Sequence, residues 1–175
     1  MKLTKRDKTI KYAVYCILLL VAALLQNVQG AWPQIGGARC FFLIPVAILL
    51  GLDEDEGLAA VIGLCAGLLW DVTSAQHMGF NAIFLMPVCY FSSSLVTYLL
   101  RATYWVGVAF GAAASLLYVV MYWLLFVVAG GGDGAFATIW YFYLPCFVYT
   151  AVMTMALNLA LIMVKKKLNK ELINE

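Results

Sequence analysis

The sequence predicts an all-α, polytopic integral membrane protein with six transmembrane helices in a single domain. Of its 175 residues, 65% are hydrophobic and 11% are charged, whereas a soluble domain is about 45–50% apolar and about 25% charged. Long apolar runs alternate with short polar breaks, and lysine and arginine gather at the two ends of the chain. No soluble fold of this size could bury so much apolar surface, and the length leaves no room for a second, soluble domain.

Each apolar run is compared with a bilayer core about 30 Å thick, which needs about 20 helical residues. The second run is borderline, because its uninterrupted part, residues 40–52, makes only about 20 Å of helix. It spans the membrane only if the helix extends back past Arg39, and a re-entrant hairpin that never crosses is the alternative. The third run must likewise continue through Asp71. The predicted spans of the domain 1–175 are 12–28, 34–52, 57–75, 81–100, 105–129 and 140–164.

The basic residues predict the orientation. Six spans place both termini on one side, and an odd number would divide the two basic ends across the membrane. With cytoplasmic termini, the cytoplasmic segments hold every lysine and arginine except Arg39. Such a bias is typical of cytoplasmic loops. The acidic turn from Asp53 to Glu56 would then also face the cytoplasm.

The third span has one marked face. Gly63, Gly67 and Asp71 are spaced four residues apart, so they share a side of the helix. Two glycines let a neighbouring backbone approach closely. An acidic side chain in a membrane must face protein or water. We therefore predict that this face points inward. Gly107, Gly111 and Ser115, also spaced four residues apart, predict a second small-residue packing face in the fifth span.

Arg39 and Asp71 each lie 16 residues from Asp55, one before it and one after it. In an antiparallel hairpin of two helices, equal counts from the turn mean equal depth. We therefore hypothesise that the two side chains form an ion pair that joins the second span to the third. In the alternative, Arg39 extends to the headgroups and Asp71 caps the exit of its own helix into water.

The sequence offers no catalytic set. The five cysteines form no C-x-x-C pair, and His77 is the only histidine. The glycine run from Gly130 to Gly134 lacks the Lys-Ser/Thr of a phosphate-binding loop. The basic N-terminal arm directly precedes an apolar run, which is typical of an orientation signal rather than a nucleic-acid site. We expect a protein that is not an enzyme and that holds no cofactor and no metal.

The string GLCAGLLWD, from Gly63 to Asp71, with Gly79 after a short loop, resembles the signature region of the MreD family, the rod-shape-determining membrane proteins of bacteria. The chain length, the six-span layout and the basic termini match as well. The residues that carry the resemblance specifically are Gly63, Gly67, Leu68, Asp71 and Gly79. Members often have basic residues where this chain has Asp53 to Glu56.

The resemblance implies a fold similar to the substrate-binding S subunits of energy-coupling-factor vitamin transporters. It implies a non-enzymatic scaffold in the bacterial cytoplasmic membrane, with both termini cytoplasmic. Its partners would be an MreC-type membrane protein and, within the elongation complex of peptidoglycan synthesis, MreB, RodA and a class B penicillin-binding protein. The candidate binding residues are Arg39, Gly63, Gly67, Asp71 and Gly79.

A transporter S subunit is the alternative function. Such subunits usually carry small residues at four-residue spacing in the first span, where they dock on their energising partner. Here Ala13 is followed at that spacing by Ile17 and Val21. The docking face is therefore missing from the sequence, which favours the scaffold.

Overall fold

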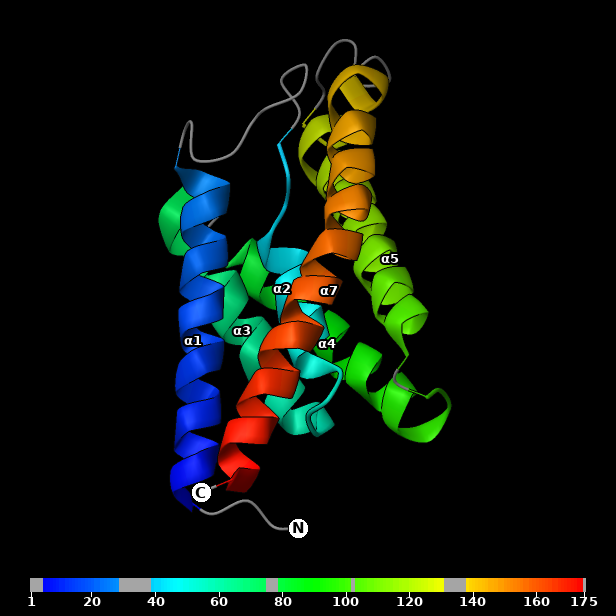
Figure 1. The fold of residues 1–175 in the computed structure, drawn as a ribbon. Coiled ribbons are helices and arrows are strands. Elements are labelled where there is room, and N and C mark those ends of the chain that lie inside the picture. The colour runs from blue at the N-terminus through cyan, green and yellow to red at the C-terminus, as the bar shows by residue number, and fades with distance from the viewer. Residues whose placement is uncertain (1–4, 29–38, 75–78, 102, 131–137, 175) are drawn as a thin grey trace.

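The computed structural model describes residues 5–28, 39–74, 79–101, 103–130 and 138–174. Every regular element in these ranges is a helix, and five helices are long and apolar enough to cross a membrane. The predicted class, an all-helical multi-pass membrane protein, is confirmed. The elements are α1 (Lys5–Asn27), α2 (Leu43–Gly51), α3 (Glu56–Ser74), α4 (Phe80–Tyr98), α5 (Tyr104–Tyr122), its π-helical continuation η1 (Trp123–Val128), η2 (Ile139–Tyr143) and α7 (Leu144–Asn174) (Figure 1).

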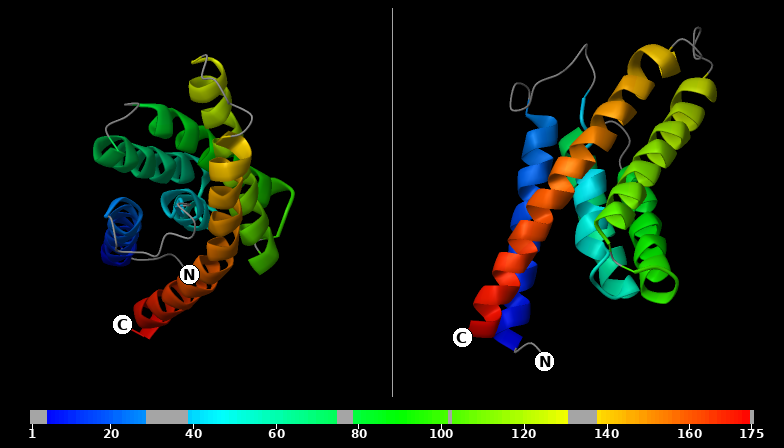
Figure 2. Two further views of the ribbon diagram at one scale, coloured as in Figure 1. Left: turned by 90° about the horizontal axis from the view of Figure 1, so that it is seen from above. Right: turned by 45° about the vertical axis from the view of Figure 1, so that its right-hand side comes forward.

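The short helix α2 lies at the centre of the bundle. It packs against α1, α3, α4, α5 and α7, and the view from above in Figure 2 shows these helices around it. All nine of its residues are buried, and Leu43, Ile44 and Leu50 are completely inaccessible. The most apolar short segment of the chain therefore supplies the core on which the longer helices pack.

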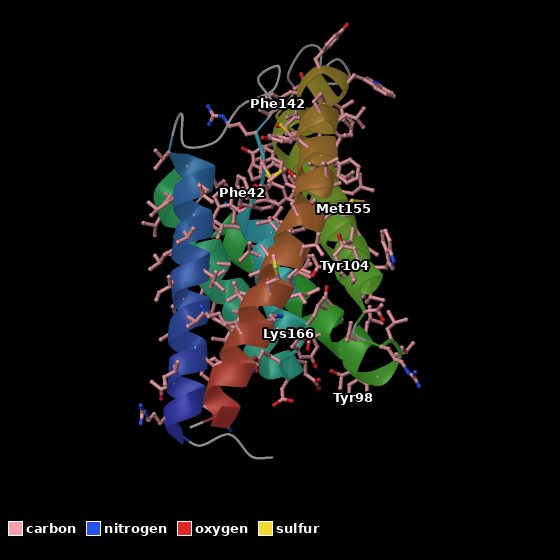
Figure 3. The ribbon with its side chains drawn as sticks, viewed as in Figure 1. Phe42, Tyr98, Tyr104, Phe142, Met155 and Lys166 are labelled. Atoms are coloured by element: carbon pink, nitrogen blue, oxygen red, sulfur yellow. The ribbon has the colours of Figure 1, made fainter. Side chains whose placement is uncertain are left out.

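The two ends of the bundle differ. α1 begins and α7 ends at one end, which we call the terminal end, and the turn between α2 and α3 lies there as well (Figures 1 and 2). We call the opposite end, where α1 ends and η2 lies, the distal end. Figure 3 shows Phe142 at the distal end and Tyr98 at the terminal end.

The second predicted span, 34–52, is not one continuous helix. Within its described part, residues 39–52, helix α2 covers only nine residues, or about 14 Å. Pro45 explains where the helix starts, because it has no N–H to donate to the carbonyl of residue 41 and its ring would clash with that carbonyl. Residues 39–42 therefore precede α2 as non-helical chain, and only five helices have the length of a span.

The second predicted small-residue face is confirmed where α5 meets α7. A Cβ atom added to Gly107 would lie 3.0 Å from Nδ2 of Asn158, and one added to Gly111 would lie 2.6 Å from a methyl group of Thr154. Asn158 also donates a hydrogen bond from Nδ2 to the carbonyl of Tyr104 at 2.8 Å. The two glycines thus let polar side chains of α7 lie directly against the backbone of α5.

Candidate functional site

The glycine face of α3 packs against α4, as its spacing predicts. A Cβ atom on Gly63 would lie 2.5 Å from the carbonyl oxygen of Leu85. One on Gly67 would lie 2.5 Å from the backbone nitrogen of Ala82. Both distances are too short for any real contact, so only glycine permits this approach. The two helices are the most closely joined pair in the bundle, and Asp71 lies on the same face of α3.

Asp71 caps the start of α4. Its side chain is only 3% exposed. Oδ1 accepts hydrogen bonds from the backbone N–H of Asn81 at 3.2 Å and from Nδ2 of Asn81 at 2.9 Å. Oδ2 accepts one from the backbone N–H of Ala82 at 3.2 Å. A carboxylate at a helix N-terminus satisfies N–H groups that have no partner inside the helix and favours the helix dipole.

Gly79 makes this cap possible. It immediately precedes α4 and has φ +90°, the left-handed conformation that side chains other than glycine rarely adopt. The carbonyl of Gly79 accepts the first bond of the helix, from the N–H of Ile83 at 3.0 Å. Gly79 and Asp71 therefore start α4 together, one through its backbone and the other through its carboxylate.

The hypothesised ion pair between Arg39 and Asp71 is not formed. The ion pairs of the described residues do not include it, Arg39 is exposed, and both oxygens of Asp71 face α4. The counting argument was wrong because it assumed two helices. Residues 39–41 lie outside the helix, and extended chain rises about 3.3 Å per residue against 1.5 Å in a helix. The alternative, in which Asp71 caps a helix, is closer to the structure. Asp71 caps the start of α4, however, and not the end of α3.

The segment before α2 is held by side chains. The backbone N–H of Arg39 donates to Sγ of Cys146 at 3.3 Å, that of Phe41 to Oγ1 of Thr150 at 3.1 Å, and that of Leu43 to Oε1 of Gln26 at 3.0 Å. Every second N–H therefore has a partner on α7 or α1. Non-helical backbone at membrane depth is tolerated only where protein or a cavity satisfies it in this way.

A cavity of about 750 Å³ opens at the distal end. This volume lies within the range of small-molecule sites. Six regions of the chain contribute: the end of α1, the segment before α2, the end of α3, the start of α4, α5 and η2. The described lining residues are Gln26, Asn27, Arg39, Cys40, Phe41, Trp70, Thr73, Ser74, Asn81, Tyr118, Tyr122, Phe142 and Tyr143.

One wall of the cavity is aromatic. Trp70 and Tyr118 stack with ring centroids 4.8 Å apart, and Phe41 lies 5.7 Å from Trp70 and 5.4 Å from Tyr118. The hydroxyl of Tyr118 donates to Oδ1 of Asn81 at 2.9 Å. Since Asp71 holds the amide group of the same asparagine, a chain of hydrogen bonds runs from Asp71 through Asn81 to Tyr118. Asp71 thus fixes the cavity wall without lining it.

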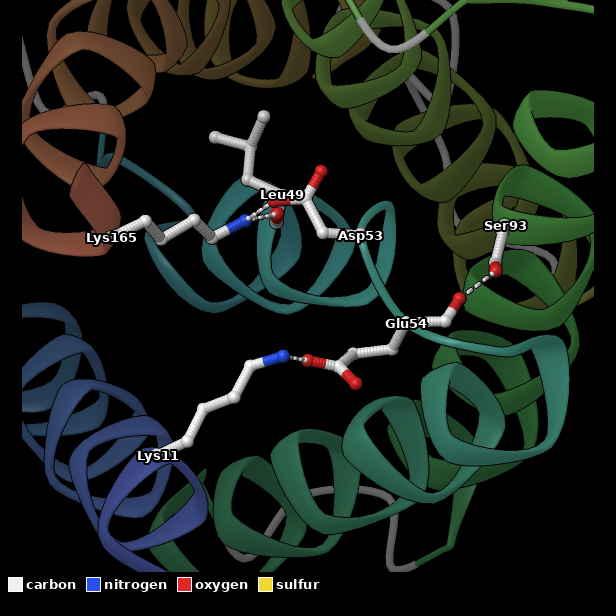
Figure 4. Close-up of polar contacts among 6 residues, drawn as sticks. All are labelled: Lys11, Leu49, Asp53, Glu54, Ser93 and Lys165. Carbon is white, nitrogen blue, oxygen red and sulfur yellow. Dashed lines mark hydrogen bonds and ion pairs between the residues drawn. The ribbon is translucent and has the colours of Figure 1, made fainter. Parts of the chain in front are cut away.

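The acidic turn at the terminal end binds the basic ends of α1 and α7 (Figure 4). Lys11 pairs with Glu54, which is buried. Nζ of Lys165 lies 2.5 Å from Oδ2 of Asp53 and donates to the carbonyl of Leu49 at 2.6 Å. From α4, Oγ of Ser93 donates to the carbonyl of Glu54 at 2.6 Å. The acidic turn therefore joins α1, α4 and α7.

The candidate residues thus fall into two groups. Gly63, Gly67, Asp71 and Gly79 act together at the junction of α3 and α4, whereas Arg39 lies at the cavity. Sequence reasoning did not find the aromatic wall or the polar side chains of α7. Cys146, Thr150, Thr154 and Asn158 are spaced four residues apart and are all buried. That spacing was a readable signal of an inward polar face.

The described part of the chain contains no group of three histidine, cysteine, aspartate or glutamate side chains that could hold a metal ion. His77 lies outside the described residues. Fold and site together define a multi-pass helical membrane protein with a cavity at one end of its bundle. No known protein family, curated protein or solved structure matches the chain.

Proposed function

We propose that the protein is a non-enzymatic scaffold of the MreD type in the bacterial cytoplasmic membrane. It would bind an MreC-type membrane protein and thereby connect MreB filaments to RodA and a class B penicillin-binding protein. The single observation that carries the proposal is the resemblance of Gly63–Asp71 and Gly79 to the signature region of that family. These residues also act as one unit here, since together they join α3 to α4 and start α4.

The proposal includes six passages through the bilayer, a fold similar to that of transporter S subunits, and a cytoplasmic terminal end. Five helices can supply five passages. In this proposal residues 39–52 would supply the sixth, which is supported by the course of this segment from the distal end toward the terminal end (Figure 1). The lysines of the terminal end favour the cytoplasmic side.

Cysteine labelling tests this topology. Exposed positions at the two ends of the bundle are compared in a cysteine-free background, with an impermeant thiol reagent on intact spheroplasts. Cysteines at Thr73 and Tyr141 should react, and cysteines at Asp55 and Arg101 should react only after the membrane is opened. Labelling of Asp55 from outside would contradict the six passages.

A transporter S subunit is the second candidate function, and the distal cavity is the observation that favours it. The surface of α1 argues against the transporter function. Ile17, Val21 and Leu24 are 58%, 46% and 61% exposed, so large side chains cover the outer side of the helix that such subunits use for docking. Small residues at this surface would be needed for close helix contact.

Depletion in the native bacterium separates the two functions. We expect rod-shaped cells to round up, and we expect the affinity-tagged protein to co-purify with an MreC-type partner. A variant that keeps the fold, Gly57→Ala, should complement depletion fully, because a Cβ atom there meets no atom within 4 Å. Tight and specific binding of a vitamin, with normal cell shape on depletion, would support the transporter instead.

A further inference from the structure

We propose that the distal cavity binds an organic anion, a phosphate or carboxylate group that carries an apolar or ring-shaped part. This inference goes beyond the scaffold function and does not depend on it. It rests on the charge, the free hydrogen-bond donors, the aromatic wall and the volume of the cavity. None of these features is needed to pack α3 against α4.

The charge of the cavity is positive. Arg39 is the one charged side chain among the described residues that line it. The backbone of Arg39 is held by the hydrogen bond from its N–H to Cys146. The guanidinium group is exposed and has no partner in the described part of the chain. Asp71 forms no ion pair with it, because both carboxylate oxygens are hydrogen-bonded to the start of α4. Arginine binds carboxylate and phosphate with two parallel hydrogen bonds.

Two of the residues that line the cavity with Arg39 carry hydrogen-bond donors without a partner in the described part of the chain. Oε1 of Gln26 accepts a bond from the N–H of Leu43, which leaves the amide N–H₂ of Gln26 available. The indole N–H of Trp70, which can only donate, also has no hydrogen-bond partner among the described residues. An occupant rich in acceptor oxygens would therefore satisfy both groups, whereas a cation would meet a guanidinium and further donors.

The occupant must be larger than an inorganic ion. A volume of about 750 Å³ is far more than phosphate alone would fill. The rings of Phe41, Trp70 and Tyr118 form a continuous apolar surface on one side, and planar or aliphatic groups pack well against such rings. Two sources provide this chemistry: the headgroup of an anionic lipid, or a dissolved aromatic acid.

Tryptophan fluorescence of the purified full-length protein in a neutral detergent tests the proposal, since Trp70 lines the cavity. The two anionic probes are a short-chain phosphatidylglycerol and phenyl phosphate. Their neutral counterparts are a phosphatidylcholine of the same chain length and benzyl alcohol. Trp70→Phe assigns the signal to the cavity. Arg39→Gln removes the charge, Arg39→Lys keeps it, and Arg101→Gln removes an exposed arginine at the other end.

We expect at least one anionic probe to give a saturable change at a concentration where its neutral counterpart gives none. Arg39→Gln should weaken that binding about tenfold or more, because a charge-assisted hydrogen bond is lost. Arg39→Lys should retain most of it, and Arg101→Gln should equal the native protein. A response to phosphatidylglycerol alone identifies a lipid headgroup, and a response to phenyl phosphate alone identifies a dissolved acid.

Three results would overturn the proposal: equal binding of charged and neutral probes, unchanged affinity in Arg39→Gln, or no saturable response to either anion. Unfolding would not imitate them, because the side chain of Arg39 is exposed and the melting temperature of each variant is measured alongside. The readout uses purified protein, so its failure would leave the shape phenotype and the scaffold function untouched. Conversely, normal cell shape on depletion would not alter the measured affinity.

Discussion

Gly67→Ala should destabilise the protein by about 2–3 kcal/mol, which corresponds to a fall in melting temperature of roughly 5–10 °C. The added Cβ atom would lie 2.5 Å from the backbone nitrogen of Ala82 and 2.6 Å from the carbonyl oxygen of Asn81. Backbone atoms cannot rotate away as the end of a flexible side chain can. The two helices must therefore move apart at this point.

Gly57→Ala is the matched control, because it makes the same chemical change in the same helix. No atom lies within 4 Å of a Cβ atom at that position, and alanine has the higher helix propensity. Its melting temperature should be equal to that of the native protein or slightly higher. Thermal unfolding in detergent, followed by size-exclusion chromatography, measures both variants. Equal stability of Gly67→Ala and Gly57→Ala would mean that α3 and α4 do not approach this closely.

Asp71→Ala should cost about 2–4 kcal/mol, because it leaves three hydrogen-bond donors at the start of α4 without an acceptor. The cavity wall should loosen as well, since Asn81 would no longer hold Tyr118 in one position. Arg39→Ala should change stability by less than about 0.5 kcal/mol, as is usual for an exposed side chain. Thermal unfolding of each purified variant measures these effects.

The double variant Arg39→Ala with Asp71→Ala distinguishes the cap from an ion pair. If Asp71 serves α4 alone, the two effects should add within about 0.5 kcal/mol. A coupling energy clearly above this value would support the ion-pair hypothesis instead. The charge swap, Arg39→Asp with Asp71→Arg, should for the same reason lose at least as much stability as the two single changes lose together.

The sequence predicted the inward face of α3 at its junction with α4 well, because the residues that form this face lie close together in the sequence. Gly63, Gly67 and Asp71 lie on one helix, and the helical period alone places them on one face. Apolar length likewise indicated the five long helices, although α1 begins seven residues before its predicted span and α7 ends ten residues after its own. What the spacing could not provide was the partner, and Asp71 turned out to serve backbone groups that carry no sequence signal.

The segment 39–52 and the cavity depend instead on residues far apart in the chain. Pro45 was the local sequence signal that a helix through residue 41 would be interrupted. The groups that satisfy the resulting free N–H donors, Cys146 and Thr150, lie more than 100 residues away. The cavity is lined from six regions, and no single region among them has an unusual composition. Such a site appears only when the helices are placed in space.

The acidic turn has a consequence for the order of synthesis. Lys11 is made before Glu54, so the buried carboxylate meets its counter-ion as soon as α2 and the turn after it pack against α1. Lys165 follows Asp53 by 112 residues, which takes roughly 6–20 s at about 5–20 residues per second. During this time the half-exposed carboxylate of Asp53 stays in contact with water. Because α7 is made after the other described helices, its docking closes this bundle, and a nascent chain stalled before α7 would keep that carboxylate free.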